Sequence, residues 1–160
     1  MNSEQRAYIS TIRRAGQEEI LIKKTGWEEI NLAAHSHSKH QIIYTLSGTL
    51  HVQIGLTNYF VPEKHIAWIP GNVPHELCSK NRQVSLVIYY LEGLPPAESG
   101  AFGEFSIYTV DAMMAGNLKY IASKGPRIER AEAPELYDFT LCFFRLLPSM
   151  CPAADILLKT

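Results

Sequence analysis

The chain has 160 residues, of which 46% are hydrophobic and 19% are charged, and its formal net charge is −1. This length suits one domain with a core of its own, and the composition excludes a disordered chain. Duplex DNA binding needs a strong positive field, which this charge does not supply. We therefore expect any DNA-binding part to lie outside these residues.

The chain carries no segment typical of export or of a membrane span. Its first six residues contain no apolar signal core, and its longest strongly apolar stretch, 136–147, is interrupted by Asp138 and Arg145. A membrane-spanning helix needs roughly twenty apolar residues. The cysteines are odd in number and scattered, at Cys78, Cys142 and Cys151. We expect a cytoplasmic protein with reduced thiols and no membrane partner.

From about residue 17 to residue 110, the sequence predicts short strands separated by turns. Gly, Pro and Asn stand at the breaks between these strands. The predicted strands cover residues 18–24, 27–34, 41–46, 49–54, 59–61, 66–69, 73–78, 84–91 and 105–110. Short strands at this spacing predict an antiparallel barrel or sandwich.

After residue 110 the apolar pattern takes a helical period. Asp111 suits the N-cap of a helix over 111–123, and Pro134 suits the first position of a second helix over 134–147. The second helix is apolar around nearly its whole circumference, so it is expected to be buried on two sides. The second surface is either a partner subunit or the flank of its own barrel.

Histidines gather early in the chain. His35 and His37 share a face if the chain is extended there, and Gln41 has the same parity. Four extended residues span roughly 13 Å, so these three side chains could share one ion only if the chain bends between His37 and Gln41. A fourth candidate ligand, His75, follows a prolyl turn over 70–74. The alternative is a set of metal-free histidines at a barrel rim.

This pattern resembles the paired cupin motifs. It consists of the two spaced histidines, Gln41, Gly48, Pro70 and His75. In metal-binding cupins the corresponding positions hold His, His, Glu and His, which ligate one divalent ion inside the barrel. Gln41 stands where those cupins have Glu, and a neutral amide is a weaker ligand than a carboxylate.

The cupin resemblance implies a mainly β protein, with a double-stranded β-helix or jelly-roll barrel followed by two C-terminal α-helices. It also implies one divalent transition metal (Zn, Ni, Fe or Mn). The implied metal ligands are His35, His37, Gln41 and His75.

Residues 27–91 are also similar to the amino-terminal domain of AraC-type transcription regulators, through the segments 40–44, 47–48, 67–70 and 73–75. The resemblance implies a barrel that binds a small-molecule effector and a helix pair that forms a homodimer. DNA would be bound by a C-terminal helix-turn-helix domain that is not in this chain. On this interpretation, residues 1–110 are the barrel with its N-terminal arm, and 111–160 are the helical dimerisation segment of the same domain.

The expected effector-binding residues lie mainly on the inner face of one predicted strand. Gln41, Ile43 and Thr45 alternate along it and mix polar with apolar groups, which suits a small organic molecule. Trp68 is a further candidate as a stacking wall for the effector, and a core position is its alternative. The pattern does not identify the effector.

The competing function is a self-standing metal-dependent cupin enzyme of the dioxygenase or isomerase type. An oxygenase commonly holds its metal with two histidines and a carboxylate. Glu76 adjoins His75, but strand parity turns it outward, and the motifs contain no other carboxylate. We therefore expect a sensor domain rather than an enzyme.

Overall fold

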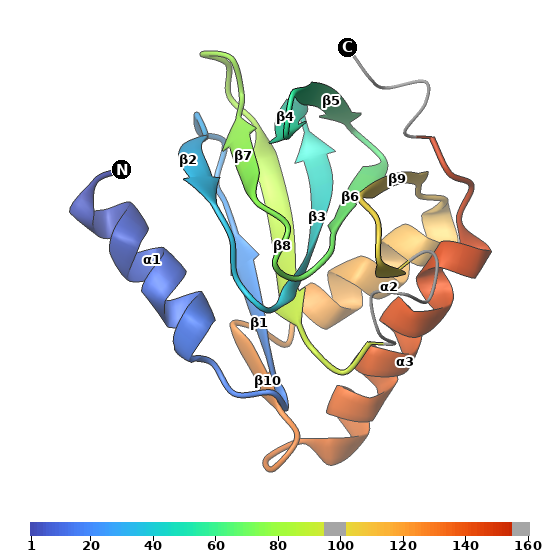
Figure 1. Ribbon diagram of the computed structural model, residues 1–160. Helices are drawn as coiled ribbons and strands as arrows, with labels where there is room; N and C mark the ends of the chain where they lie inside the picture. Colours follow the sequence, from blue (N-terminus) through green and yellow to red (C-terminus); the bar gives the residue numbers. More distant parts are fainter. Residues whose placement is uncertain (95–101, 155–160) are drawn as a thin grey trace.

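The computed structural model describes residues 1–94 and 102–154, which form two β-sheets packed face to face, with helices at one edge and over one outer face (Figure 1). The helices are α1 (Ser3–Arg14), α2 (Ala112–Ala122) and α3 (Pro134–Met150). The strands before the prolyl turn are β1 (Glu19–Lys24), β2 (Asn31–His35), β3 (His40–Ser47), β4 (Thr49–Ile54), β5 (Thr57–Pro62) and β6 (His65–Ile69). The later strands are β7 (His75–Cys78), β8 (Ser85–Leu91), β9 (Ser106–Thr109) and β10 (Arg127–Glu129).

All strand pairs are antiparallel. The larger sheet has six strands in the order β10-β1-β8-β3-β6-β9, and the smaller has four in the order β2-β7-β4-β5. One hydrophobic cluster lies between the sheets, and a second lies between the larger sheet and the helices α2 and α3. The larger sheet is therefore buried on both faces, which explains why β8 is apolar along nearly its whole length.

The register of β3 decides which side chains point into the barrel. Gln41 pairs with Ile69 and Tyr90, and Ile43 pairs with Ala67 and Ile88. These residues face the interior between the sheets, whereas Ile42 and its partner Trp68 lie on the helix-covered face. Successive side chains of a strand alternate between faces, so one strand contributes to two different environments.

Helix α1 covers the edge of the barrel where β1 and β2 lie. It begins with a capping box, in which Asn2 and Gln5 each accept a hydrogen bond from the other's backbone N–H. Ile9 and Ile12 are buried in the cluster between the sheets. This helix is not among the elements predicted from the sequence, and it packs along the edge of the two sheets from outside.

The expected mainly β barrel with two C-terminal helices is confirmed, with corrections at several boundaries. The strand expected over 27–34 is shorter and later, since β2 covers Asn31–His35. The second helix does not stop before Pro148 but contains it and continues to Met150. Pro148 lacks the N–H that would donate to the Phe144 carbonyl, and the helix ends only two residues after this missing bond.

The segment expected to be helical also contributes β10 to the larger sheet. Its residues 155–160 lie outside the described residues. Within the part of the chain that is described, none of the helices is both long and apolar enough to cross a membrane.

Candidate functional site

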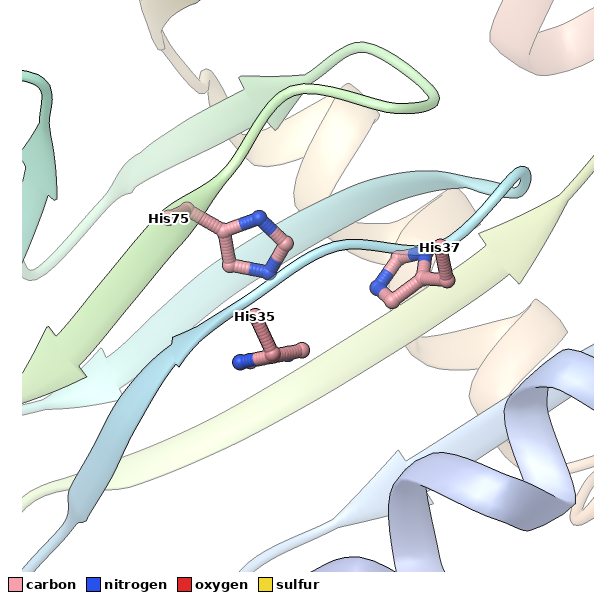
Figure 2. A group of neighbouring side chains, drawn as sticks. All are labelled: His35, His37 and His75. Atoms are coloured by element: carbon pink, nitrogen blue, oxygen red, sulfur yellow. The ribbon is translucent and has the colours of Figure 1, made fainter.

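Three histidines meet inside one end of the barrel, as Figure 2 shows. His35 is at the end of β2, His37 lies in the turn after it, and His75 begins β7. One ring nitrogen from each lies within 4.8 Å of those of the other two. The three side chains are almost fully removed from solvent. The predicted convergence of these histidines is therefore confirmed.

The chain makes the bend that a shared site requires. Residues 36–39 leave the strand, and the Asn72 N–H donates to the His37 carbonyl at 2.7 Å. Gly71 lies so close to this bend that a Cβ atom there would be 2.3 Å from the Ser38 carbonyl oxygen. Only glycine allows this approach, so the prolyl turn and the histidine turn hold each other in place.

Backbone carbonyls fix the protonation of all three rings. The Nδ1–H groups of His35, His37 and His75 donate to the carbonyls of Ala33, Lys39 and Val73, at 3.0, 2.8 and 2.9 Å. A carbonyl only accepts, so Nδ1 carries the proton and Nε2 of each neutral ring keeps its lone pair. Histidines that bind metals are commonly oriented by this kind of second hydrogen bond.

Burial keeps these rings neutral at physiological pH. It lowers the pKa of His35, of His37 and of His75, the last to about 4. The neighbouring histidines add a smaller lowering effect on the pKa of His75. The cluster is therefore a set of neutral imidazoles whose Nε2 atoms are available as acceptors or metal ligands.

Gln41 is nearby, as the sequence predicts, and contacts the cluster through His37. The Gln41 Oε1 atom lies 2.9 Å from His37 Nε2, and the Gln41 Nε2 atom is buried without a partner. A neutral His37 with its proton on Nδ1 cannot donate to Oε1. A half-turn of the Gln41 amide removes the conflict, because its NH₂ group then donates to His37 and Oε1 becomes the free acceptor.

These residues fit a divalent transition metal. The Nε2 atom of His75 is buried and unpaired, which is costly unless a ligand completes it. Zinc-type ligands bind at about 2.0–2.1 Å, so tetrahedral ligand atoms lie roughly 3.3 Å apart. Small ring movements would bring nitrogens that lie within 4.8 Å to this spacing. The three-histidine cluster could thus bind a metal ion.

A cleft of about 320 Å³ opens beside the cluster, beneath the N-terminal half of α1. Its floor is apolar and comes from both sheets, through Leu32, Leu77, Leu86 and Ile88. Its rim is polar and includes Asn2, Gln5 and Asn31. Ligand-binding pockets typically have volumes of roughly 300–1,000 Å³ with a mainly apolar lining. Four strands and one helix contribute to this cleft. It therefore has no continuous pattern in the sequence from which it could be predicted.

Two tyrosines join the cleft to the histidines. The hydroxyl groups of Tyr8, in α1, and Tyr90, in β8, form a hydrogen bond, and both side chains line the cleft. The ring of Tyr90 also contacts the ring of His37, with 5.5 Å between their centroids. On the other side of α1, Arg13 donates to the Ser36 carbonyl between the two histidines of the turn. Helix α1 therefore touches both the cleft and the histidine turn.

The structure separates the expected effector-binding residues into two groups. Gln41, Ile43 and Thr45 lie on the interior face and are fully buried, and Thr45 donates to the Val61 carbonyl. They lie beside the cleft, which is lined by their partners on β8. Trp68 does not join them, because it packs against Phe144 on the helix-covered face. Its position supports the alternative that Trp68 is a core residue, and not the expectation that it stacks against the effector.

The arrangement is a barrel of two sheets with a cleft beneath α1, and comparison with known families gives a match for the barrel. Residues 24–101 match the family described as the AraC-like ligand binding domain. Over these residues the barrel is similar to AraC-like ligand-binding domains. None of the curated proteins compared with the sequence matches it.

Among solved structures, the chain is similar to ToxT from Vibrio cholerae. With wild-type ToxT bound to an unsaturated fatty acid, the sequence identity is 12% and the TM-score is 0.56. The superposition covers 86% of this chain. With an apo variant of ToxT, the identity is 12%, the TM-score is 0.57 and 86% of this chain is covered. With ToxT bound to (E)-4-(8-methylnaphthalen-1-yl)but-3-enoic acid, the identity is 10%, the TM-score is 0.54 and 82% of this chain is covered. The match covers 55–57% of these ToxT chains, and at this identity it establishes the fold alone.

Proposed function

We propose that this chain is the small-molecule effector-sensing and dimerising part of an AraC-type transcription regulator. Residues 1–110 form the effector-binding barrel with its N-terminal arm, and residues 111–160 form the dimerisation segment of the same domain. DNA would be bound by a further domain that is not in this sequence. The observation that carries the proposal is the cleft of about 320 Å³ in a barrel that is similar to AraC-like ligand-binding domains.

The effector lies in this cleft, with its apolar part on the floor formed by both sheets. A ligand with an apolar part is supported by the ToxT structures, which were solved with a bound unsaturated fatty acid and with a bound substituted butenoic acid. Because the rim includes α1, an effector would also touch a helix that reaches the histidine turn. Binding of an effector in the cleft can thus change the position of α1.

The metal belongs to the proposal as a second ligand of the barrel. His35, His37, Gln41 and His75 would hold one divalent ion such as Zn, Ni, Fe or Mn, and the ion would replace the Gln41 amide as the partner of His37 Nε2. Such an ion supplies Lewis acidity. In the described residues the cluster contains histidines without a carboxylate, which supports a sensor more than an oxygenase.

Dimerisation is supported by apolar side chains that α2 and α3 leave exposed. They are Met113, Tyr120, Phe139, Leu146 and Met150. An exposed apolar surface of this kind marks an interaction site. The adjoining stripe of α3, which includes Phe143 and Leu147, is buried against the protein's own sheet. The helix thus packs on its own barrel along one stripe, and the exposed stripe beside it is the surface proposed for the partner.

A thermal-shift screen of small organic molecules tests the effector proposal. A ligand at a hundred times its dissociation constant should raise the free energy of unfolding by ~2.7 kcal/mol. Asn31→Trp fills the cleft from its exposed rim and should abolish this rise. Leu56→Trp, in the exposed turn between β4 and β5, is the control and should leave the rise unchanged. A ligand that stabilises wild type and Asn31→Trp equally would place the site elsewhere.

A further inference from the structure

The rim of the α1 cleft carries an excess of negative charge. Glu4 lies at the start of α1, and Glu28 and Glu29 lie between β1 and β2. Among the described residues, none of these three carboxylates takes part in a salt bridge. These three glutamates line the cleft, and their carboxylates form no ion pair with a cation of the described residues.

The one cationic residue of the lining does not neutralise this rim. The Lys23 ammonium group lies 4.4 Å from the centroid of the Tyr8 ring. A cation over an aromatic face is attracted by the ring's negative face. This contact shows that the Tyr8 side of the cleft already accommodates a positive charge.

The floor and the rim together define a ligand chemistry. Leu32, Leu77, Leu86 and Ile88 offer an apolar surface that favours a hydrocarbon or aromatic body. The free carboxylates at the rim favour a group of positive charge at the end of that body. A ligand carboxylate at the same place would meet charges of its own sign.

We propose that the effector is a cationic amphiphile, with an apolar body and a protonated amine that faces Glu28 and Glu29. This inference rests on the proposed function, because it names the chemical class of the ligand that the cleft senses. It assigns the two glutamates as specificity-determining residues and the apolar floor as the surface that provides affinity.

The test is calorimetry on the full 160-residue chain with hexylamine, hexanol and hexanoate, at physiological salt and at high salt. These probes share one apolar body and differ in charge. We expect hexylamine to bind most tightly and hexanoate most weakly. The advantage of hexylamine over hexanol should be smaller at high salt, because exposed charges are screened.

Three variants locate the charge recognition. Glu28→Gln combined with Glu29→Gln should weaken hexylamine by about three- to tenfold, because each exposed charge pair contributes a modest energy, and should leave hexanol unchanged. Glu132→Gln, an exposed change before α3, should alter neither. Asn31→Trp should block hexylamine and hexanol alike.

The outcomes separate the two proposals. If hexanoate binds as tightly as hexylamine, or if the double variant leaves hexylamine binding unchanged, the cationic class is wrong while the cleft remains a ligand site. If none of the probes is sensitive to Asn31→Trp, the cleft is not the site, and both proposals fail.

Discussion

The two faces of the six-stranded sheet differ in polarity although the same strands form both. On the helix-covered face, β3 contributes Ile42 and Tyr44, which pack with Trp68 in an apolar cluster under α2 and α3. On the interior face, the same strand contributes Gln41 and Thr45, beside the histidines and the cleft. Alternation along one strand thus joins a structural surface to a functional one.

The difference shows which polar groups the fold needs. On the helix side, the Tyr89 hydroxyl donates to the Leu118 carbonyl and ties the sheet to α2. On the interior side, His75 Nε2 lacks a partner, and so does one polar atom of the Gln41 amide, which is Oε1 once the amide is turned. Buried polar groups normally find partners, and an unpaired cluster is costly unless a ligand completes it. The helix side leaves one buried group, the Trp68 Nε1–H, without a partner, whereas the unpaired atoms of His75 and Gln41 lie together at the histidine cluster, where one ligand could complete them.

The largest expected effect concerns the outer surface of the helix side. Phe139→Glu combined with Leu146→Glu should dissociate the proposed dimer. Each side chain contributes roughly 1.5–3 kcal/mol when buried, and twofold symmetry counts each one twice. Light scattering with size exclusion should give twice 18.0 kDa for the wild type and 18.0 kDa for the variant.

The control for this test is Leu56→Glu, which changes a fully exposed leucine in the turn between β4 and β5. It should leave the mass unchanged. A wild-type protein of 18.0 kDa at micromolar concentration would refute the dimer. A dimer that survives both substitutions would move the interface away from α3.

The next effect concerns the buried side of the same helices. Phe144 is fully buried and contacts Trp68, Tyr89 and Phe143. Phe144→Ala should lower the free energy of unfolding by ~3–5 kcal/mol, because it removes apolar contacts and leaves a cavity. Chemical denaturation measures this loss, and Leu56→Ala should change it by less than about 0.5 kcal/mol. A loss below 1 kcal/mol would mean that the helix side is not the continuous core described above.

On the interior side, the expected effect depends on metal. Protein stripped with a chelator and then given zinc or nickel at a hundred times its dissociation constant should gain ~2.7 kcal/mol of stability. His75→Ala should remove the gain, whereas His65→Ala, outside the cluster, should keep it. Gln41→Glu should tighten binding, because a carboxylate is a better ligand for a divalent cation than an amide.

The metal-dependent gain is compared within each variant, so any loss of basal stability does not affect the result. An equal gain in wild type and in His75→Ala would show that the ion binds elsewhere. The interior side would then be completed by the organic ligand alone.

Sequence reasoning predicted the side of the barrel on which a residue lies better than it predicted its neighbours. Parity placed His35, His37 and Gln41 together, and the prolyl turn brought His75 to them, because both follow from local geometry. Parity also separates Trp68 from Ile43 once their strands are paired, but the pairing register of β3 with β6 cannot be seen in either strand alone.

The missed features all depend on long-range packing. Helix α1 has a capping box but only a short apolar stripe at Ile9 and Ile12, and such a helix is stabilised by the barrel it covers. Strand β10 is three residues long and exists because β1 offers it an edge. The cleft joins residues of α1, β2, β7 and β8, so no contiguous stretch of sequence carries its pattern.

The smallest expected effect separates the two sides through their helix caps. Asn2 caps α1 at the cleft, and the Asp111 side chain accepts a hydrogen bond from the Met114 N–H at the start of α2. Each change to alanine should cost about 1 kcal/mol. Helix α1 lies outside the sheets and can open locally, so Asn2→Ala should speed hydrogen exchange of α1 amides about fivefold. Asp111→Ala should lower the global free energy of unfolding but leave α1 exchange unchanged, because α2 packs in the other cluster.

If Asp111→Ala speeds α1 exchange as much as Asn2→Ala does, α1 opens only when the whole barrel unfolds. The cleft side would then have no independent motion with which to report an effector.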